Sequence, residues 1–194
     1  MTIMTHTEYL KPISEEWFLD NAYWGERICI DIDGVVCEYN FPKIVKSFFG
    51  VDLSPLSIFA YDLADVLGVA PALIDTMFEE QVYGKPTFVT GAIDTLKEWK
   101  SQGNELIIYS NRVKYMKGID LVRWLIDWQV PFSGIDIKGD GKYDVHIDDS
   151  PGKLMATNSN VKLLFSQSWN QRCLNITKQL IRVNSWAGIK EIVR

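Results

Sequence analysis

Four short apolar segments, each ending abruptly in polar residues, constrain the fold of this chain more than any other feature. They occupy residues 26–36, 105–112, 144–152 and 161–170. Each has the pattern of a strand that runs into a loop. Helical patterns lie between the strands, at residues 91–103 and 118–130. Strands that alternate with helices indicate a Rossmann-like α/β fold, with a parallel sheet and crossover helices on its faces.

One stretch interrupts this alternation. From residue 40 to residue 88 the chain has helical patterns but no convincing strand. We therefore predict a small helical cap inserted after the first strand, at residues 40–88, and a core domain formed by residues 1–39 and 89–194. A chain of 194 residues is long enough for one domain with such an insertion.

Composition excludes several classes of partner. With 20 basic and 25 acidic residues the net charge is −5, which argues against a nucleic acid polymer as ligand. No apolar run is long enough for a membrane helix. Three cysteines without zinc-ligand spacing favour a reducing compartment, and we expect the protein in the cytoplasm. The sequence leaves a homodimer open.

Polar residues gather at the predicted strand ends. In chain order they are Asp31, Asp33, Ser110, Asn111, Asp148 and Asp149. Ligand sites of parallel sheets lie beyond the carboxyl ends of the strands, so we expect these side chains to meet. Four converging carboxylates repel one another unless a cation and an ammonium group lie among them. Their hard oxygen atoms favour Mg²⁺ over zinc as the cation.

Each feature also has a purely structural interpretation. Asp-x-Asp-Gly occurs in turns and in calcium loops, although the residues that follow Asp33 lack the later acidic ligands of a calcium loop. The pair Asp148-Asp149 could cap a helix, and Ser110-Asn111 could form a turn. His146 is expected to be a buried strand residue. The tryptophans of the helical patterns, Trp99, Trp124 and Trp128, are expected to pack in the core.

Taken together, the motifs resemble those of the haloacid dehalogenase superfamily of phosphotransferases. The order is Asp31-x-Asp33-Gly-Val, then Ser110-Asn-Arg, then a lysine, then Asp148-Asp149-Ser-Pro. A bacterial receiver domain has similar residues, but its paired acids come first in the chain. Residues 49–69, 165–170 and 182–186 further resemble the 5′(3′)-deoxyribonucleotidase branch and its bacterial and phage relatives. The resemblance extends from Arg27 to the carboxyl terminus.

The resemblance implies a role for each motif residue. Asp31 would be the nucleophile, and Asp33 the acid that protonates the leaving alcohol and then activates water. The Ser110 side chain and the Asn111 amide would bind the phosphoryl oxygens, together with Arg112.

The resemblance also implies the metal ligands. Asp149 would bind Mg²⁺ through its side chain, together with the carboxylate of Asp31 and the backbone carbonyl of Asp33. Asp148 would be a further ligand or a partner of one.

The lysine of the third motif has two candidates. Lys138 lies ten residues before the acidic pair, which is the spacing of the deoxyribonucleotidases. Lys142 directly precedes the strand Tyr-Asp-Val-His-Ile, and this local pattern favours it slightly.

The resulting function is a Mg²⁺-dependent phosphomonoesterase that hydrolyses nucleoside monophosphates through an aspartyl-phosphate. The cap is rich in aromatic residues, and we expect Phe41 and Tyr61 to stack on the nucleobase. Two alternatives stay open: a phosphatase for another small ester such as a sugar phosphate, and a non-catalytic nucleotide-binding regulatory protein.

Overall fold

The structure of the chain is a computed structural model. It describes residues 25–53, 63–114, 116, 118–173 and 180–193. Within these residues no helix is both long enough and apolar enough to cross a membrane.

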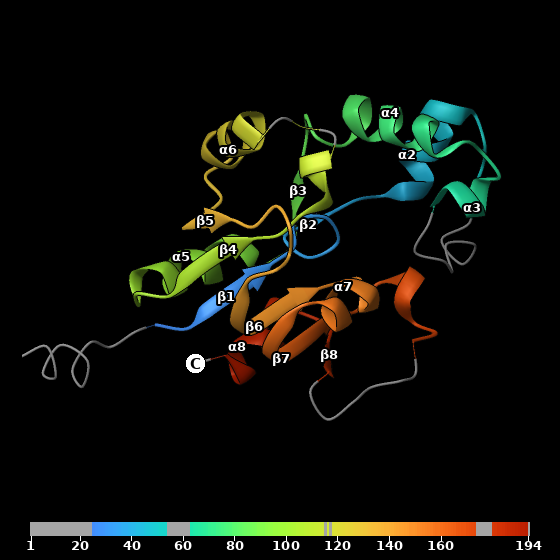
Figure 1. Cartoon of the computed structure of the whole chain (residues 1–194). Coiled ribbons are helices and arrows are strands. Elements are labelled where there is room, and N and C mark those ends of the chain that lie inside the picture. Colours follow the sequence, from blue (N-terminus) through green and yellow to red (C-terminus); the bar gives the residue numbers. More distant parts are fainter. Residues whose placement is uncertain (1–24, 54–62, 115, 117, 174–179, 194) are drawn as a thin grey trace, which may run out of the picture.

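A six-stranded parallel sheet forms the centre of the molecule (Figure 1). Its strands, in spatial order, are β5 (Gly134–Ile135), β4 (Glu105–Ile108), β1 (Arg27–Ile30), β6 (Lys142–Asp148), β7 (Asn158–Phe165) and β8 (Leu180–Val183). The predicted Rossmann-like parallel sheet is thus confirmed. Strands β5 and β8 at the two edges were not predicted from the sequence, since β5 has only two residues and shows no periodicity.

Strand β1 lies between β4 and β6 and makes parallel ladders with both. From β1 the chain first builds one half of the sheet, through β4 and β5, and then returns to build the other half, from β6 to β8. The carboxyl end of β1 is therefore the point where the strand order reverses. In open parallel sheets this is where ligands bind.

Helices cover both faces of the sheet. The main core joins one face to α5 (Ala92–Ser101), α6 (Gly118–Asp127) and α8 (Trp186–Ile192). A smaller cluster joins the other face to α7 (Pro151–Ala156). Alternate residues of each strand point to opposite faces, so Ile28 and Ile30 enter the main core while Cys29 enters a cluster on the other face.

The predicted core tryptophans fall into two groups. Trp99 and Trp124 are buried in the main core, as expected. Trp128 is 38% exposed, because α6 ends at Asp127 and the residue after it no longer follows the apolar side of the helix.

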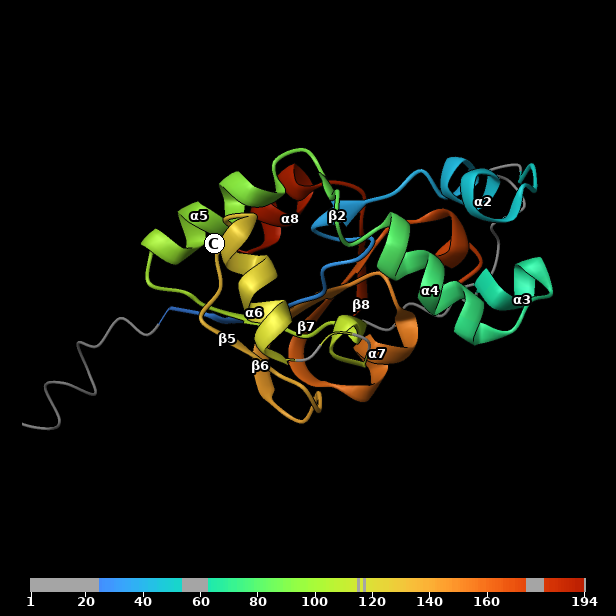
Figure 2. The same ribbon diagram turned by 90° about the horizontal axis from the view of Figure 1, so that it is seen from above.

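Three further helices form a group apart from the sheet (Figures 1 and 2). They are α2 (Phe41–Phe49), α3 (Leu63–Leu67) and α4 (Pro71–Gln81), and they pack around their own small cluster, which includes Val45 and Met77. The start of α2 is set locally: the Asn40 side chain accepts a hydrogen bond from the Lys43 amide at 3.1 Å. We call this group the cap helices.

Two short antiparallel strands connect the core and the cap helices. Strand β2 (Cys37–Glu38) precedes α2 and pairs with β3 (Thr87–Phe88), which follows α4. The chain therefore leaves the core domain and returns to it through neighbouring segments.

Candidate active site

Three carboxylates meet at the carboxyl edge of the sheet. Asp31 directly follows β1, Asp148 ends β6, and Asp149 comes next. One oxygen from each lies within 4.8 Å of the others. The β1–β6 ladder aligns the strand ends, and the Asp31 amide continues it by donating to the Ile147 carbonyl at 3.0 Å. We call these three residues the carboxylate cluster.

Burial makes it unfavourable for the carboxylates of the cluster to be ionised. Asp31 and Asp149 are each 3% exposed, and Asp148 is fully buried. Burial raises the pKa of Asp31 to about 7; Lys153 opposes this shift and Asp148 adds to it. Burial, with repulsion from Asp148 and Asp31, raises the pKa of Asp149 well above its usual range. Cations near the cluster are therefore needed to keep Asp31 and Asp149 ionised at neutral pH.

Lys153 provides the ammonium group of the cluster. Its Nζ lies 3.2 Å from Oδ1 of Asp31 and 3.4 Å from Oδ2 of Asp148. The sequence analysis did not select this lysine, because it follows the acidic pair instead of preceding it.

The structure does not bring either predicted lysine to the cluster. Lys142 begins β6 and Asp148 ends it, so the two lie about 20 Å apart at the rise of an extended strand, which is beyond the reach of a lysine side chain. Lys138 is exposed in the loop before β6 and makes no ion pair with any residue the structure describes. The distance between Lys142 and Asp148 does not support the predicted catalytic role of Lys142, and the role of Lys138 stays a prediction.

The local sequence explains why Lys153 faces the cluster. Ser150 is the N-cap of α7 and accepts a hydrogen bond from the Lys153 amide, so Lys153 lies in the first turn. Helix α7 has only six residues, so Lys153 lies close to both of its ends and the helix dipole does not single it out. The available signal in the sequence was the position of Lys153 four residues after Asp149, in the segment that directly follows the strand end.

The surroundings of Asp149 are fitted closely to its carboxylate. The indole Nε1 of Trp169 donates to Oδ2 at 2.8 Å, and the Asn170 side chain donates to the Asp149 carbonyl at 2.9 Å. Gly34 has a φ of +81°, and a Cβ atom there would lie 2.3 Å from Oδ2. The loop after β1 can approach Asp149 only because residue 34 has no side chain.

This donor set fits a hard divalent cation. Three carboxylates and one ammonium group leave a charge of −2, which one Mg²⁺ ion would neutralise. Oδ1 of Asp149 is buried and has no hydrogen-bond partner among the described residues, so it has a lone pair for a metal. All three side chains offer oxygen, which Mg²⁺ prefers.

Asp33 has a different environment from Asp31. Its carboxylate lies outside the carboxylate cluster and accepts hydrogen bonds from the Arg112 guanidinium, with Nη2 2.8 Å from Oδ1 and Nε 2.9 Å from Oδ2. The Tyr39 hydroxyl also donates to Oδ1, at 2.7 Å. Arg112 is fully buried, and the one ion pair it forms among the described residues is with Asp33, so its predicted phosphate-binding role stays a prediction.

The remaining predicted residues occupy the same edge. Ser110 is buried just beyond β4, and Asn111 begins a short 3₁₀ helix, η3 (Asn111–Lys114). Their phosphate-binding role stays a prediction. His146 is fully buried in β6, as expected; its Nδ1 lies 2.6 Å from Oγ1 of Thr157, and its Nε2 lies 3.4 Å from Oδ2 of Asp148.

Aromatic side chains connect the cap helices to the catalytic edge. The Phe41 ring lies edge-on to Trp169, with centroids 5.4 Å apart, and also contacts Tyr39 and Phe78. Trp169 and Tyr39 are the residues that donate to Asp149 and Asp33. Tyr61, the second predicted stacking residue, lies outside the described residues.

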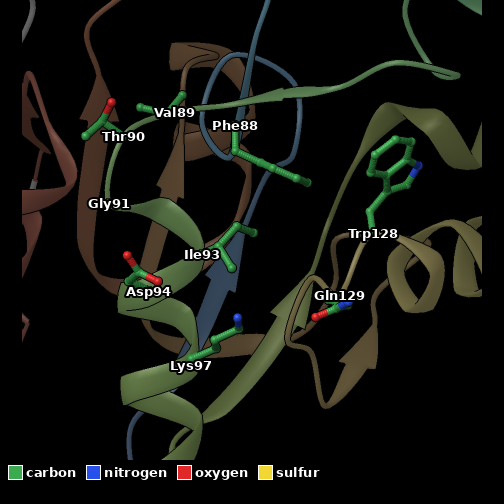
Figure 3. Close-up of a pocket in the computed structure, with 9 residues that line it drawn as sticks. All are labelled: Phe88, Val89, Thr90, Gly91, Ile93, Asp94, Lys97, Trp128 and Gln129. Atoms are coloured by element: carbon green, nitrogen blue, oxygen red, sulfur yellow. The ribbon is translucent and has the colours of Figure 1, made fainter.

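A separate groove of about 370 Å³ lies between the start of α5 and the end of α6 (Figure 3). Its lining includes Phe88, Ile93 and Trp128 but none of the motif carboxylates. It is therefore not the site built by the motifs.

Comparison with known structures agrees with the fold. A haloacid dehalogenase-superfamily hydrolase from Ehrlichia chaffeensis matches at 13% identity and a TM-score of 0.53, over 88% of this chain and 97% of that chain. A haloacid dehalogenase-like hydrolase from Streptococcus pneumoniae matches at 12% identity and a TM-score of 0.59, over 86% and 98%. A phosphoserine phosphatase in its apo form matches at 14% identity and a TM-score of 0.51, over 87% and 99%. No curated protein sequence gives a significant match.

These likenesses show that the chain has the fold of haloacid dehalogenase-like hydrolases. The model of the family described as 5′ nucleotidase, deoxy (Pyrimidine), cytosolic type C protein matches residues 26–194. The chain belongs to this family, and the predicted resemblance to the deoxyribonucleotidase branch is confirmed.

The carboxylate cluster generates a prediction about metal binding. Mg²⁺ should raise the melting temperature, because the cation binds only where folding has gathered the carboxylates. At a concentration 100 times its Kd, a ligand stabilises by about 2.7 kcal/mol. Differential scanning calorimetry with and without Mg²⁺ measures this shift. Asp149→Asn should lose most of it, whereas Asp144→Asn, at an exposed position of β6, should keep it.

The stabilisation by Mg²⁺ should increase as the pH rises. The raised pKa of Asp31, about 7, and that of Asp149 mean that the metal-free folded state binds more protons than the unfolded state above about pH 4. Metal-free stability should therefore fall as the pH rises from about 4 to 7, and the stabilisation by Mg²⁺ should grow over the same range. A Mg²⁺ shift of equal size at pH 5 and pH 7.5 would contradict this prediction.

Proposed function

We propose that this phosphatase is Mg²⁺-dependent and hydrolyses nucleoside monophosphates through an aspartyl-phosphate formed on Asp31. The observation that carries the proposal is the buried carboxylate cluster with the Lys153 ammonium 3.2 Å from Asp31. The family match supports a nucleotide as the substrate.

In the first step a carboxylate oxygen of Asp31 attacks phosphorus. The bond from phosphorus to the ester oxygen breaks, its electron pair stays on that oxygen, and the oxygen takes a proton from the Asp33 carboxyl group. A carboxylate can attack an anionic phosphate only where the charge is compensated. The Lys153 ammonium is placed for this compensation, next to Asp31.

In the second step water attacks the aspartyl-phosphate. Asp33, now a carboxylate, accepts a proton from the water as the new bond to phosphorus forms. The bond between phosphorus and the Asp31 oxygen breaks, which releases inorganic phosphate and restores both acids to their starting states. Ser110 and the Asn111 amide would hold the phosphoryl oxygens during both transfers.

The metal would be held by the side chains of Asp31, Asp148 and Asp149 and by the backbone carbonyl of Asp33. When bound, Mg²⁺ supplies neutralising charge and polarises the phosphoryl group. His146, at 3.4 Å from Asp148, would help to keep that carboxylate in place.

The rest of the ester would extend toward the cap helices. Phe41 and Trp169 pack edge to face, and Trp169 also donates to Asp149. An aromatic surface this close to the cluster supports a substrate with a planar base, such as a nucleoside monophosphate, over a sugar phosphate. We therefore keep Phe41 as a nucleobase-stacking residue and add Trp169 to it.

The proposed nucleophile is tested by Asp31→Asn. The amide keeps the size of the side chain but cannot attack phosphorus, so kcat for a nucleoside monophosphate should fall by at least about 1,000-fold. Phosphate release with Mg²⁺ present measures this. Turnover within tenfold of the wild type, in a variant shown to be folded by circular dichroism, would refute the covalent mechanism.

The lysine assignment is tested by comparing two variants. Lys153→Met should lower kcat by about 100- to 1,000-fold, because it removes a preorganised charge from the reacting groups. Lys142→Met, at the far end of β6, should change kcat by no more than about twofold. The opposite ranking of the two variants would return the catalytic role to Lys142.

Substrate selection is tested at Phe41. Phe41→Ala should lower kcat/KM for a nucleoside monophosphate by about 5- to 100-fold, equivalent to the loss of one stacked base. Hydrolysis of 4-nitrophenyl phosphate should change much less. Phe48→Ala is the matched control, because Phe48 lies on the same helix but packs against Phe49 among the cap helices. Equal losses on both substrates, or a wild type that prefers sugar phosphates, would contradict the nucleotide assignment.

A further inference from the structure

A charged side chain is fully buried beside the catalytic edge without facing the carboxylate cluster. Arg112 has no exposed surface, and the one ion pair it forms among the described residues is with Asp33. Taking a charge out of water costs several kcal/mol unless a well-placed partner compensates it. Asp33 is therefore the reason that a guanidinium can be accommodated at this position.

The Tyr39 hydroxyl contacts both members of the Arg112–Asp33 pair and holds them in one orientation. Nη2 of Arg112 donates to the Tyr39 hydroxyl at 2.6 Å, and that hydroxyl donates to Oδ1 of Asp33 at 2.7 Å. Nη2 also donates to Oδ1 directly, at 2.8 Å. The three groups form a closed ring of hydrogen bonds, which we call the Arg112–Tyr39 clamp.

Aromatic rings fix the guanidinium from other directions. It lies 4.0 Å from the ring centroid of Trp124 in α6 and 4.6 Å from that of Tyr83. The Trp124 indole in turn donates to the Tyr83 carbonyl at 2.7 Å. Tyr83 lies between α4 and β3, so the chain segment that returns from the cap helices contributes to the environment of Arg112.

The two oxygens of Asp33 are not equivalent in this arrangement. Oδ1 accepts from the Tyr39 hydroxyl and from both Nε and Nη2 of Arg112, whereas Oδ2, among the described residues, accepts only from Nε, at 2.9 Å. A carboxylate oxygen has two lone pairs. Oδ2 thus keeps a lone pair that can carry a proton while the clamp stays closed, and the Asp33 side chain is 23% exposed toward solvent.

We propose that Arg112 is a positioning residue, with Tyr39 as its partner, that orients Asp33 so that Oδ2 exchanges the proton with the leaving alcohol. The proposal rests on the proposed function, in which Asp33 is the general acid. Arg112 itself does not touch the substrate. Its role is to prevent the Asp33 side chain from rotating away from the proton-transfer geometry.

This role has a kinetic signature that a purely structural role lacks. An alkoxide leaving from a nucleotide needs a proton, whereas 4-nitrophenolate is stable as an anion and leaves without one. Misplacing Asp33 should therefore slow aspartyl-phosphate formation from the nucleotide much more than from 4-nitrophenyl phosphate. The ratio of the two kcat/KM values isolates this effect, because kcat/KM does not include the later hydrolysis of the aspartyl-phosphate.

The experiment compares Arg112→Met, Arg112→Lys and Asp33→Asn on both substrates with Mg²⁺. General acid catalysis contributes about 100- to 10,000-fold, so Arg112→Met should lose at least about 100-fold on the nucleotide and less than about tenfold on 4-nitrophenyl phosphate. Asp33→Asn gives the full change in the ratio of the two kcat/KM values that follows from loss of the general acid. Arg112→Lys should restore part of the nucleotide activity that Arg112→Met loses. Lys114→Met, an exposed basic residue of the same 3₁₀ helix, is the matched control and should keep the wild-type ratio.

Two outcomes overturn the proposal. One is an Arg112→Met protein that keeps its Mg²⁺-dependent melting shift but loses activity equally on both substrates. If Arg112→Met does not fold, Tyr39→Phe decides instead, because it removes the hydroxyl from the clamp and keeps the ring; an unchanged substrate ratio in that variant also overturns it. Failure of the proposed function is distinguishable from failure of this proposal. It would appear as a wild type that does not prefer nucleotides, or as an Asp31→Asn variant that keeps its turnover, and neither result involves an Arg112 variant.

Discussion

The repulsion among three buried carboxylates is the constraint on which the rest of the catalytic edge depends. In the unfolded chain Asp31 is far from Asp148 and Asp149, so only the folded protein bears the repulsion between Asp31 and these two acids. Two features reduce the repulsion: the Lys153 ammonium lies 3.2 Å from Asp31, and the Trp169 indole donates to Asp149. Gly34 allows the loop after β1 to come close to Asp149. The same unfavourable charge supports the proposal that the edge binds a divalent cation and, with it, a phosphate group.

A second ion pair separates the roles of the two acids in the Asp-x-Asp motif. Asp31 lies among other carboxylates, with its pKa raised by burial, and it faces a single ammonium. Asp33, two residues later, is held by a guanidinium and a tyrosine hydroxyl outside the cluster. Two side chains of the same type can act as nucleophile and as acid because their surroundings differ.

The cap helices are tied to this edge by side chains on both connecting segments. Tyr39, on the segment that leads to α2, bonds to Asp33, and Tyr83, on the segment that returns from α4, lies against Arg112. Phe41 adds a contact with Trp169, whose indole reaches Asp149. The surface proposed to select the substrate and the groups proposed to react with it therefore share the same contacts. A shift of the cap helices would therefore move groups that contact Asp33, the proposed general acid.

The sequence by itself determined the parallel sheet and the family, since these follow from periodicity and from the order of motifs along the chain. It predicted that four carboxylates converge, and three of them, Asp31, Asp148 and Asp149, do so, whereas Asp33 lies outside the cluster. It also indicated that His146 would be buried. The lysine at the cluster and the partner of Arg112 could not be found in this way. They depend on distances in the folded chain that the spacing of residues along the sequence does not determine. Lys153 replaces Lys142 because strand direction takes Lys142 to the far end of β6, while the first turn of α7 brings Lys153 back to the edge. Arg112 pairs with Asp33 because a buried guanidinium needs a charged partner, and only the folded chain brings the two together.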